Sequence, residues 1–133
     1  MKKRVLVVDD ENDILELISI ILSDNDITVY KAKDGLSGLE IARKKKPDLI
    51  LLDIMMPEID GWEVLKILKI DDETRNIPVA MLTCKTEIKD KVLGIQEGAI
   101  DYITKPFLTD DIIKKVKNLL TKEGKEDSSD AIE

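Results

Sequence analysis

The amino-acid sequence predicts an α/β fold in which a doubly wound sheet of five parallel strands has five helices on both faces. Two observations support this prediction: five short apolar runs recur along the chain, and a stretch with helical spacing of apolar residues follows each run. Strict alternation of strand and helix is typical of parallel sheets with helical crossovers. Right-handed crossovers leave few topologies, and we expect the flavodoxin-like strand order 2-1-3-4-5.

The predicted strands are short and largely apolar. A short, unbroken apolar run is typical of a strand that is buried on both faces of a parallel sheet. In chain order, the predicted strands are residues 4–8, 27–32, 48–52, 77–82 and 99–104. The third strand ends beside Asp53, and an ionised carboxylate buried at that edge needs a partner.

The predicted helices have their apolar residues on one face. In the first helix, these residues recur at the i, i+3, i+4, i+7 and i+8 positions that share a helical face. The marker residues of the five helices are Ile14, Leu17, Ile18, Ile21 and Leu22; Leu36, Leu39 and Ala42; Val64, Leu65 and Leu68; Ile88, Val92 and Ile95; and Ile112, Val116, Leu119 and Leu120. From Thr121 onward this spacing is lost. We therefore expect one domain over residues 1–122, and a polar tail or the start of a linker over 123–133.

Composition limits the class of protein. A chain of 133 residues fits one domain, and 43% hydrophobic residues with only 3% aromatics predict an aliphatic core. A formal net charge of −7 argues against direct nucleic-acid binding. No apolar segment is long enough to span a bilayer, and the N-terminal "MKKRVLVVDDEND" turns acidic too early for a signal peptide. The expected compartment is the cytoplasm.

Cysteine and histidine usage excludes several chemistries. Cys84 is the single cysteine, so an internal disulfide framework and a multi-cysteine zinc site are both excluded. The sequence contains no histidine. This absence removes Ser-His and Cys-His nucleophile pairs, histidine-ligated metals and a role as a phosphohistidine carrier.

Polar residues gather where the predicted strands end. Ligands of doubly wound sheets bind at the carboxyl ends of the strands, here between strands 1 and 3. Asp9 and Asp10 leave strand 1 and Asp53 leaves strand 3, so we expect the three carboxylates to converge around Mg²⁺ or a similar ion. Thr83 and Lys105 bring a hydroxyl and an ammonium to the same edge. This set predicts a phosphoryl site at which Asp53 attacks in line.

Four motifs closely resemble the response-regulator receiver domain, which is the phosphoacceptor module of bacterial and archaeal two-component signalling, typified by the chemotaxis regulator. The resemblance covers about Lys3 to Lys122. The motifs are "VLVVDDE" at 5–11, "DLILLDIMMPEIDG" at 48–61, "PVAMLT" at 78–83 and "GAIDYITKPF" at 98–107.

The resemblance implies a role for each matching residue. Asp53 would be the phosphoacceptor. Asp9, Asp10, Asp53 and the backbone carbonyl of Met55 would hold Mg²⁺ or Mn²⁺. The remaining assignments are Thr83 as the switch hydroxyl, Tyr102 as the switch aromatic, Lys105 as the phosphate-binding lysine, and Pro106 as the proline after a cis peptide bond.

The resemblance also implies a function. The phosphoryl group would come from a sensor histidine kinase or a phosphotransfer protein, and the chain would catalyse only its own phosphorylation and dephosphorylation. Phosphorylation would change the face made by helix 4, strand 5 and helix 5. That face would regulate a downstream effector, a missing C-terminal output domain or a second copy of the chain. Its exposed charged residues would be Lys89, Lys91, Glu97, Asp101, Asp111 and Lys115.

Other interpretations of these residues fit the sequence less well. Asp9 and Asp10 could cap the first helix, and Asp53 could be a turn residue, although Asp60 and Gly61 already serve the turn. A haloacid-dehalogenase-type phosphohydrolase needs an aspartate where Met55 stands. A flavodoxin needs a phosphate loop, and "DDEND" would repel the flavin phosphate. A pseudo-receiver that no longer takes phosphate is excluded only by a phosphorylation assay.

Overall fold

The computed structural model describes the backbone of residues 2–83 and 98–132, and the side chains up to residue 121 within those ranges. The five strands are β1 (Lys3–Val8), β2 (Ile27–Ala32), β3 (Leu49–Asp53), β4 (Val79–Thr83) and β5 (Asp101–Thr104). They form one parallel sheet in the order β2-β1-β3-β4-β5, which confirms the predicted topology.

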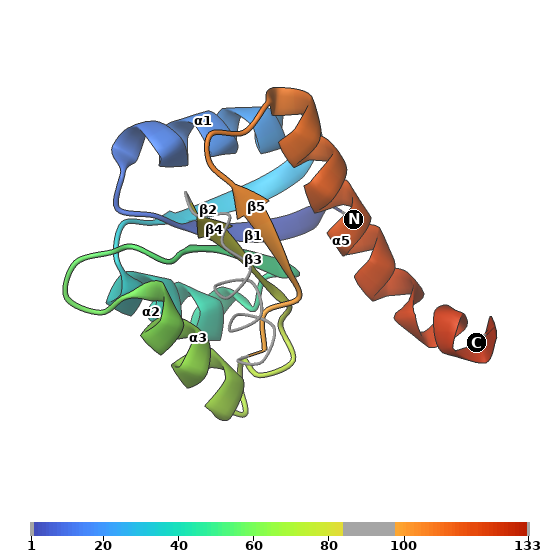
Figure 1. Cartoon of the computed structure of the whole chain (residues 1–133). Helices are drawn as coiled ribbons and strands as arrows, with labels where there is room; N and C mark the ends of the chain where they lie inside the picture. Colours follow the sequence, from blue (N-terminus) through green and yellow to red (C-terminus); the bar gives the residue numbers. More distant parts are fainter. Residues whose placement is uncertain (1, 84–97, 133) are drawn as a thin grey trace.

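Helices cover both faces of this sheet. The helices are α1 (Asn12–Ser23), α2 (Gly35–Lys45), α3 (Gly61–Ile70) and α5 (Thr109–Ile132). Helices α1 and α5 lie on one face, and α2 and α3 lie on the other (Figure 1). The helix predicted around Ile88, Val92 and Ile95 lies outside the described residues.

Helix α5 continues beyond the point where its apolar spacing ends. The sequence predicts a polar tail over 123–133, whereas the helix extends to Ile132. The domain boundary after residue 122 stays a prediction.

The sheet separates two aliphatic clusters, because successive side chains of a strand point to opposite faces. On β3, Leu49 and Leu51 pack in the cluster with α1 and α5, whereas Ile50 and Leu52 pack in the cluster with α2 and α3. Every residue of β3 and β4 is buried. This double burial explains why these strands have unbroken apolar runs in the sequence.

Strand β4 begins two residues later than the pattern predicts. Pro78 has no backbone N–H, so it cannot donate to a sheet ladder, although its carbonyl accepts a hydrogen bond from the Ile50 N–H at 3.0 Å. The regular strand therefore starts at Val79.

Among the described residues, no helix is both long and apolar enough to cross a membrane.

The connection from α3 to β4 contains a buried polar contact. Thr74 is 2% exposed, and its Oγ1 donates a hydrogen bond to the carbonyl of Leu68 at 2.8 Å. The carbonyls of the last helical turn have no partner within the helix. The Thr74 hydroxyl therefore satisfies the carbonyl of a buried residue in the last turn of α3.

Replacing Thr74 with valine keeps the shape of the side chain but removes this hydroxyl. We expect Thr74→Val to lower the free energy of unfolding by about 1 to 2 kcal/mol, since a buried carbonyl loses its partner. Urea denaturation measures the change. Thr28→Val, on the half-buried strand β2, is the matched control and should change stability by less than about 0.5 kcal/mol. Equal effects of the two substitutions would contradict this assignment.

Candidate functional site

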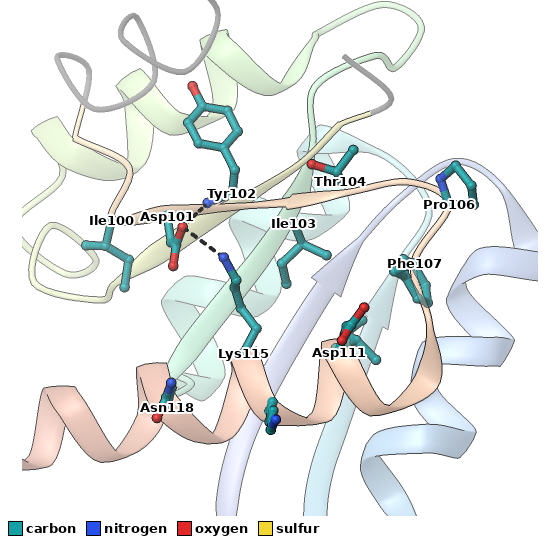
Figure 2. A pocket seen from close by; sticks show the side chains of 12 residues that line it. Ile100, Asp101, Tyr102, Ile103, Thr104, Pro106, Phe107, Asp111, Lys115 and Asn118 are labelled. Carbon is teal, nitrogen blue, oxygen red and sulfur yellow. Dashed lines mark hydrogen bonds and ion pairs between the residues drawn. The ribbon is translucent and has the colours of Figure 1, made fainter. Parts of the chain in front are cut away.

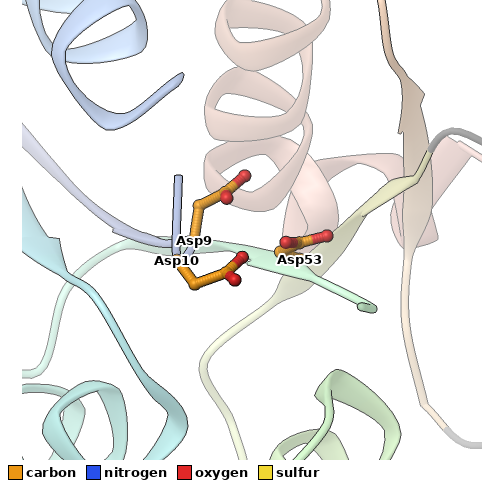
Figure 3. Close-up of side chains that lie close together, drawn as sticks. All are labelled: Asp9, Asp10 and Asp53. Atoms are coloured by element: carbon orange, nitrogen blue, oxygen red, sulfur yellow. The ribbon is translucent and has the colours of Figure 1, made fainter. Parts of the chain in front are cut away.

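Three aspartates converge at the carboxyl edge of the sheet, as the sequence predicts. Asp9 and Asp10 follow β1, and Asp53 is the last residue of the neighbouring strand β3. Carboxylate oxygens from the three residues all lie within 4.8 Å of one another. Figure 3 shows the three side chains together at this edge. Asp9 and Asp53 are buried, whereas Asp10 is exposed and leaves the cluster open to solvent on one side.

Lys105 supplies a buried positive charge to this cluster. Its Nζ lies 2.8 Å from Asp9 Oδ2, 3.4 Å from Glu11 Oε1 and 3.5 Å from Asp53 Oδ1. The backbone N–H of Lys105 donates to the carbonyl of Thr83 at 2.7 Å, which ties the end of β5 to the end of β4. The Lys105–Pro106 peptide bond is cis, as the resemblance implies.

The electrostatics of the cluster favour an additional cation. Burial and the negative charge of Asp9 raise the pKa of Asp53 from 3.8 to about 7, although Lys105 and the Met55 N–H act in the opposite direction. Burial by itself would lower the pKa of Lys105, but the hydrogen bond to Asp9 and the charge of Asp53 raise that pKa overall. One ammonium thus faces several carboxylates. Hard oxygen ligands in this arrangement suit Mg²⁺.

The backbone around Asp53 is fixed by the start of α3. The Met55 N–H donates to Asp53 Oδ1 at 3.2 Å, and the Gly61 N–H donates to the Ile54 carbonyl at 2.9 Å. A Cβ atom on Gly61 would lie 2.2 Å from the carbonyl oxygen of Asp53. Only glycine therefore allows α3 to begin directly against the backbone of Asp53. Asp60 caps this helix by accepting a hydrogen bond from the Glu63 N–H at 3.0 Å.

A pocket of about 500 Å³ opens beside the acidic cluster. Asp10, Met55 and Thr83 line it, together with Trp62 at the start of α3. Thr83 is buried at the end of β4, so its side chain reaches the same edge as the carboxylates. The pocket therefore adjoins the cluster on the side where Asp10 is exposed.

Tyr102 lies apart from these residues, within β5. It is buried, pairs in register with Met81 of β4, and packs in the cluster that includes α2 and α3. Thr104, two positions further along β5, is the register partner of Thr83. The switch role of Tyr102 and the metal-ligand role of the Met55 carbonyl stay predictions.

Sequence reasoning missed Glu11. Its carboxylate contacts Lys105, which lies 94 positions away in the chain. The available signal was a third acidic residue directly after Asp9 and Asp10, in "DDE".

A doubly wound α/β domain with an aspartate cluster and a buried lysine at the carboxyl edge of its sheet has the fold and the acidic site of a receiver domain. The model of the response regulator receiver domain family matches residues 5–117. The chain belongs to this family, and receiver domains of two-component response regulators act in phosphorylation-dependent signalling.

Two curated relatives illustrate the match. The DNA-binding dual master transcriptional regulator RpaA of Synechocystis is 43% identical over 117 residues, which are 88% of this chain and 48% of the relative. The alkaline phosphatase synthesis transcriptional regulatory protein PhoP of Bacillus subtilis is 45% identical over 120 residues, which are 90% of this chain and 49% of the relative. The chain thus spans about half the length of these relatives.

Solved structures show the same fold. The chemotaxis protein CheY4 of Vibrio cholerae has a TM-score of 0.85 at 31% identity and covers 90% of this chain and 99% of its own. A CheY-like receiver domain protein from Methanospirillum hungatei has a TM-score of 0.87 at 29% identity, with 95% and 99% coverage.

The raised pKa of Asp53 predicts a pH-dependent stability for the metal-free protein. Between pH 3.8 and about 7, the folded state holds a proton that the unfolded chain releases, so stability falls as the pH rises through this window. Asp53→Asn removes the titrating charge. It should raise the free energy of unfolding by about 2 to 4 kcal/mol at about pH 8, with the gain vanishing at about pH 4 and below.

Urea denaturation in EDTA across this pH range is the measurement. Glu40→Gln, on the exposed surface of α2, removes one carboxylate without touching the cluster and should show no such pH-dependent gain. A gain for Asp53→Asn that is independent of pH would count against this electrostatic account.

Proposed function

We propose that this chain is a phosphorylation-activated signalling switch that accepts a phosphoryl group on Asp53. The donor would be a phosphohistidine of a sensor histidine kinase or of a phosphotransfer protein, and the expected compartment is the cytoplasm. The observation that carries the proposal is the convergence of Asp9, Asp10 and Asp53 with Lys105 at one edge of the sheet. The chain would catalyse only its own phosphorylation and dephosphorylation.

The residues of the cluster fit a divalent metal. Asp9, Asp10 and Asp53 offer hard oxygen ligands within 4.8 Å of one another, and two of the three are buried. Together with the backbone carbonyl of Met55, they would hold Mg²⁺ or Mn²⁺. A bound metal would offset negative charge on the phosphoryl oxygens.

The side chains of the site would each have a separate role in the phosphoryl transfer. A carboxylate oxygen of ionised Asp53 forms the new bond to phosphorus while the P–N bond of the donor phosphohistidine breaks in line with it. The ammonium of Lys105 lies 3.5 Å from Asp53 Oδ1 and binds a phosphoryl oxygen as charge accumulates there. The hydroxyl of Thr83, at the end of β4, would move toward the phosphoryl group and donate a hydrogen bond to it.

Acetyl phosphate offers a direct test, because a small acyl phosphate can replace the protein donor. With Mg²⁺ present, intact-mass measurement should show the addition of a single phosphate. No product should form with Asp53→Asn, or in excess EDTA. Asp72→Asn, at a highly exposed carboxylate outside the cluster, is the control and should be phosphorylated like the original chain. Labelling that survives in Asp53→Asn would refute the assignment of the acceptor.

Output would pass from Thr83 through Tyr102 to the face made by helix 4, β5 and α5. A phosphoryl group adds roughly two negative charges and strong acceptor oxygens at Asp53. The Thr83 hydroxyl can donate to them only by moving, and Tyr102 would enter the space it leaves. This would shift the equilibrium between two existing surface arrangements.

The described part of this face has suitable chemistry for a polar contact. A cavity of about 640 Å³ lies between β5 and α5, and Asp101 and Lys115 form a 3.3 Å ion pair there (Figure 2). Lys89, Lys91 and Glu97 lie outside the described residues. The partner would be a downstream effector, an attached output domain or a second copy of the chain.

A nucleic acid is not proposed as a direct partner of this domain. The names of relatives such as RpaA describe DNA-binding regulators, but these relatives are about twice as long as the matched segment. The formal net charge of −7 here is unfavourable for contact with a phosphate backbone.

Backbone NMR with beryllofluoride, a phosphoryl mimic, tests the output route. We expect chemical-shift changes at Thr83, Tyr102 and Lys115 in addition to the loops around Asp53. The same titration of Asp53→Asn should leave those signals unchanged, which makes it the control. Changes confined to the Asp53 loops would mean that the signal leaves by another surface.

A further inference from the structure

Glu11 occupies the position of a helix cap but does not cap its helix. Its backbone is extended before α1, yet its side chain makes no cap hydrogen bond. In contrast, Asp34 and Asp60 cap α2 and α3 by accepting hydrogen bonds from backbone N–H groups. The Glu11 carboxylate instead lies 3.4 Å from Lys105 Nζ. The Glu11 side chain is therefore directed to Lys105, and only the backbone of Glu11 takes part in the start of α1, where its carbonyl accepts a hydrogen bond from the Leu15 N–H at 3.1 Å.

Glu11 differs from the other two carboxylates that surround Lys105. Asp9 and Asp53 belong to the cluster whose oxygens lie within 4.8 Å of one another, whereas Glu11 does not. A metal cation bound in the cluster would attract the carboxylates of Asp9 and Asp53 and so weaken their interaction with the Lys105 ammonium. Of the described carboxylates that contact the Lys105 ammonium, Glu11 would then be the one that does not also interact with the metal.

We propose that Glu11 is a positioning residue that competes with the phosphoryl group for the Lys105 ammonium and so weakens phosphoryl binding at Asp53. This inference rests on the proposed phosphoryl site. An ammonium has three donors, and the N–H directed to Glu11 is not available to a phosphoryl oxygen. The negative charge of Glu11 also repels a dianionic group bound nearby.

The exposure of Glu11 sets the scale of this effect. Its side chain is 61% exposed, whereas Lys105 is 8% exposed, so water screens the pair from one side only. Ion pairs of this kind are weak contributors. We therefore expect removal of the Glu11 charge to tighten phosphoryl binding by about three-fold.

Beryllofluoride binding at saturating Mg²⁺, followed by ¹⁹F NMR, tests the inference without requiring chemical turnover. Glu11→Gln should bind the mimic about three-fold more tightly than the original chain. Asp13→Asn is the matched control, because Asp13 is an exposed carboxylate in the first turn of the same helix. It should change the affinity by less than about 1.5-fold. Glu11→Asp keeps the charge but shortens its reach, and should show part of the gain.

The outcomes separate the two proposals. A damaged fold cannot tighten binding, so a gain in Glu11→Gln alone supports the competition. Unchanged or weaker binding in Glu11→Gln, or an equal gain in Asp13→Asn, would overturn the role of Glu11 while the site itself stands. If the original chain fails to bind beryllofluoride, the proposed function is wrong, and the role of Glu11 is wrong with it.

Discussion

The ion pair between Lys105 and Asp9 is the contact on which the site depends. It joins the ends of β5 and β1, which are separated in the sheet by β3 and β4. Two buried carboxylates this close would repel each other strongly without a cation between them. The lysine reduces that repulsion but leaves the pKa of Asp53 raised. The domain therefore folds around a site that still favours more positive charge, and a divalent metal would meet that need.

Topology made much of this site predictable. A parallel sheet buried on both faces places the carboxyl ends of its strands at one edge, so Asp9 and Asp53 had to be neighbours once β1 and β3 were paired. The apolar runs also identified β3 and β4, because both faces of these strands are buried. The strands and the convergence of Asp9 and Asp53 could therefore be predicted, because both follow from burial and strand order.

Other features depended on atomic fit. Gly61 was expected only as a turn residue, whereas a Cβ atom added there would overlap the Asp53 carbonyl oxygen, so the helix start leaves no room for a side chain. The contact of Glu11 with Lys105 depends on side-chain rotamers and on an approach across 94 positions. The continuation of α5 to Ile132 runs past the last residue of its apolar helical spacing. None of these is encoded in hydrophobic periodicity, which is the main signal in a single sequence.

The alternation of β3 between two clusters also limits how the chain can change in length. One helical layer contacts Leu49 and Leu51, and the other contacts Ile50 and Leu52. Because side chains alternate in this way, the direction of the Asp53 side chain depends on how many residues precede it in the strand. Insertion or deletion of one residue inside β3 would move the residues on one side of the change to the opposite face of the sheet and turn the Asp53 carboxylate away from Asp9. The site can therefore tolerate changes of length only in the connecting loops, because the number of residues in β3 sets the direction of the Asp53 side chain.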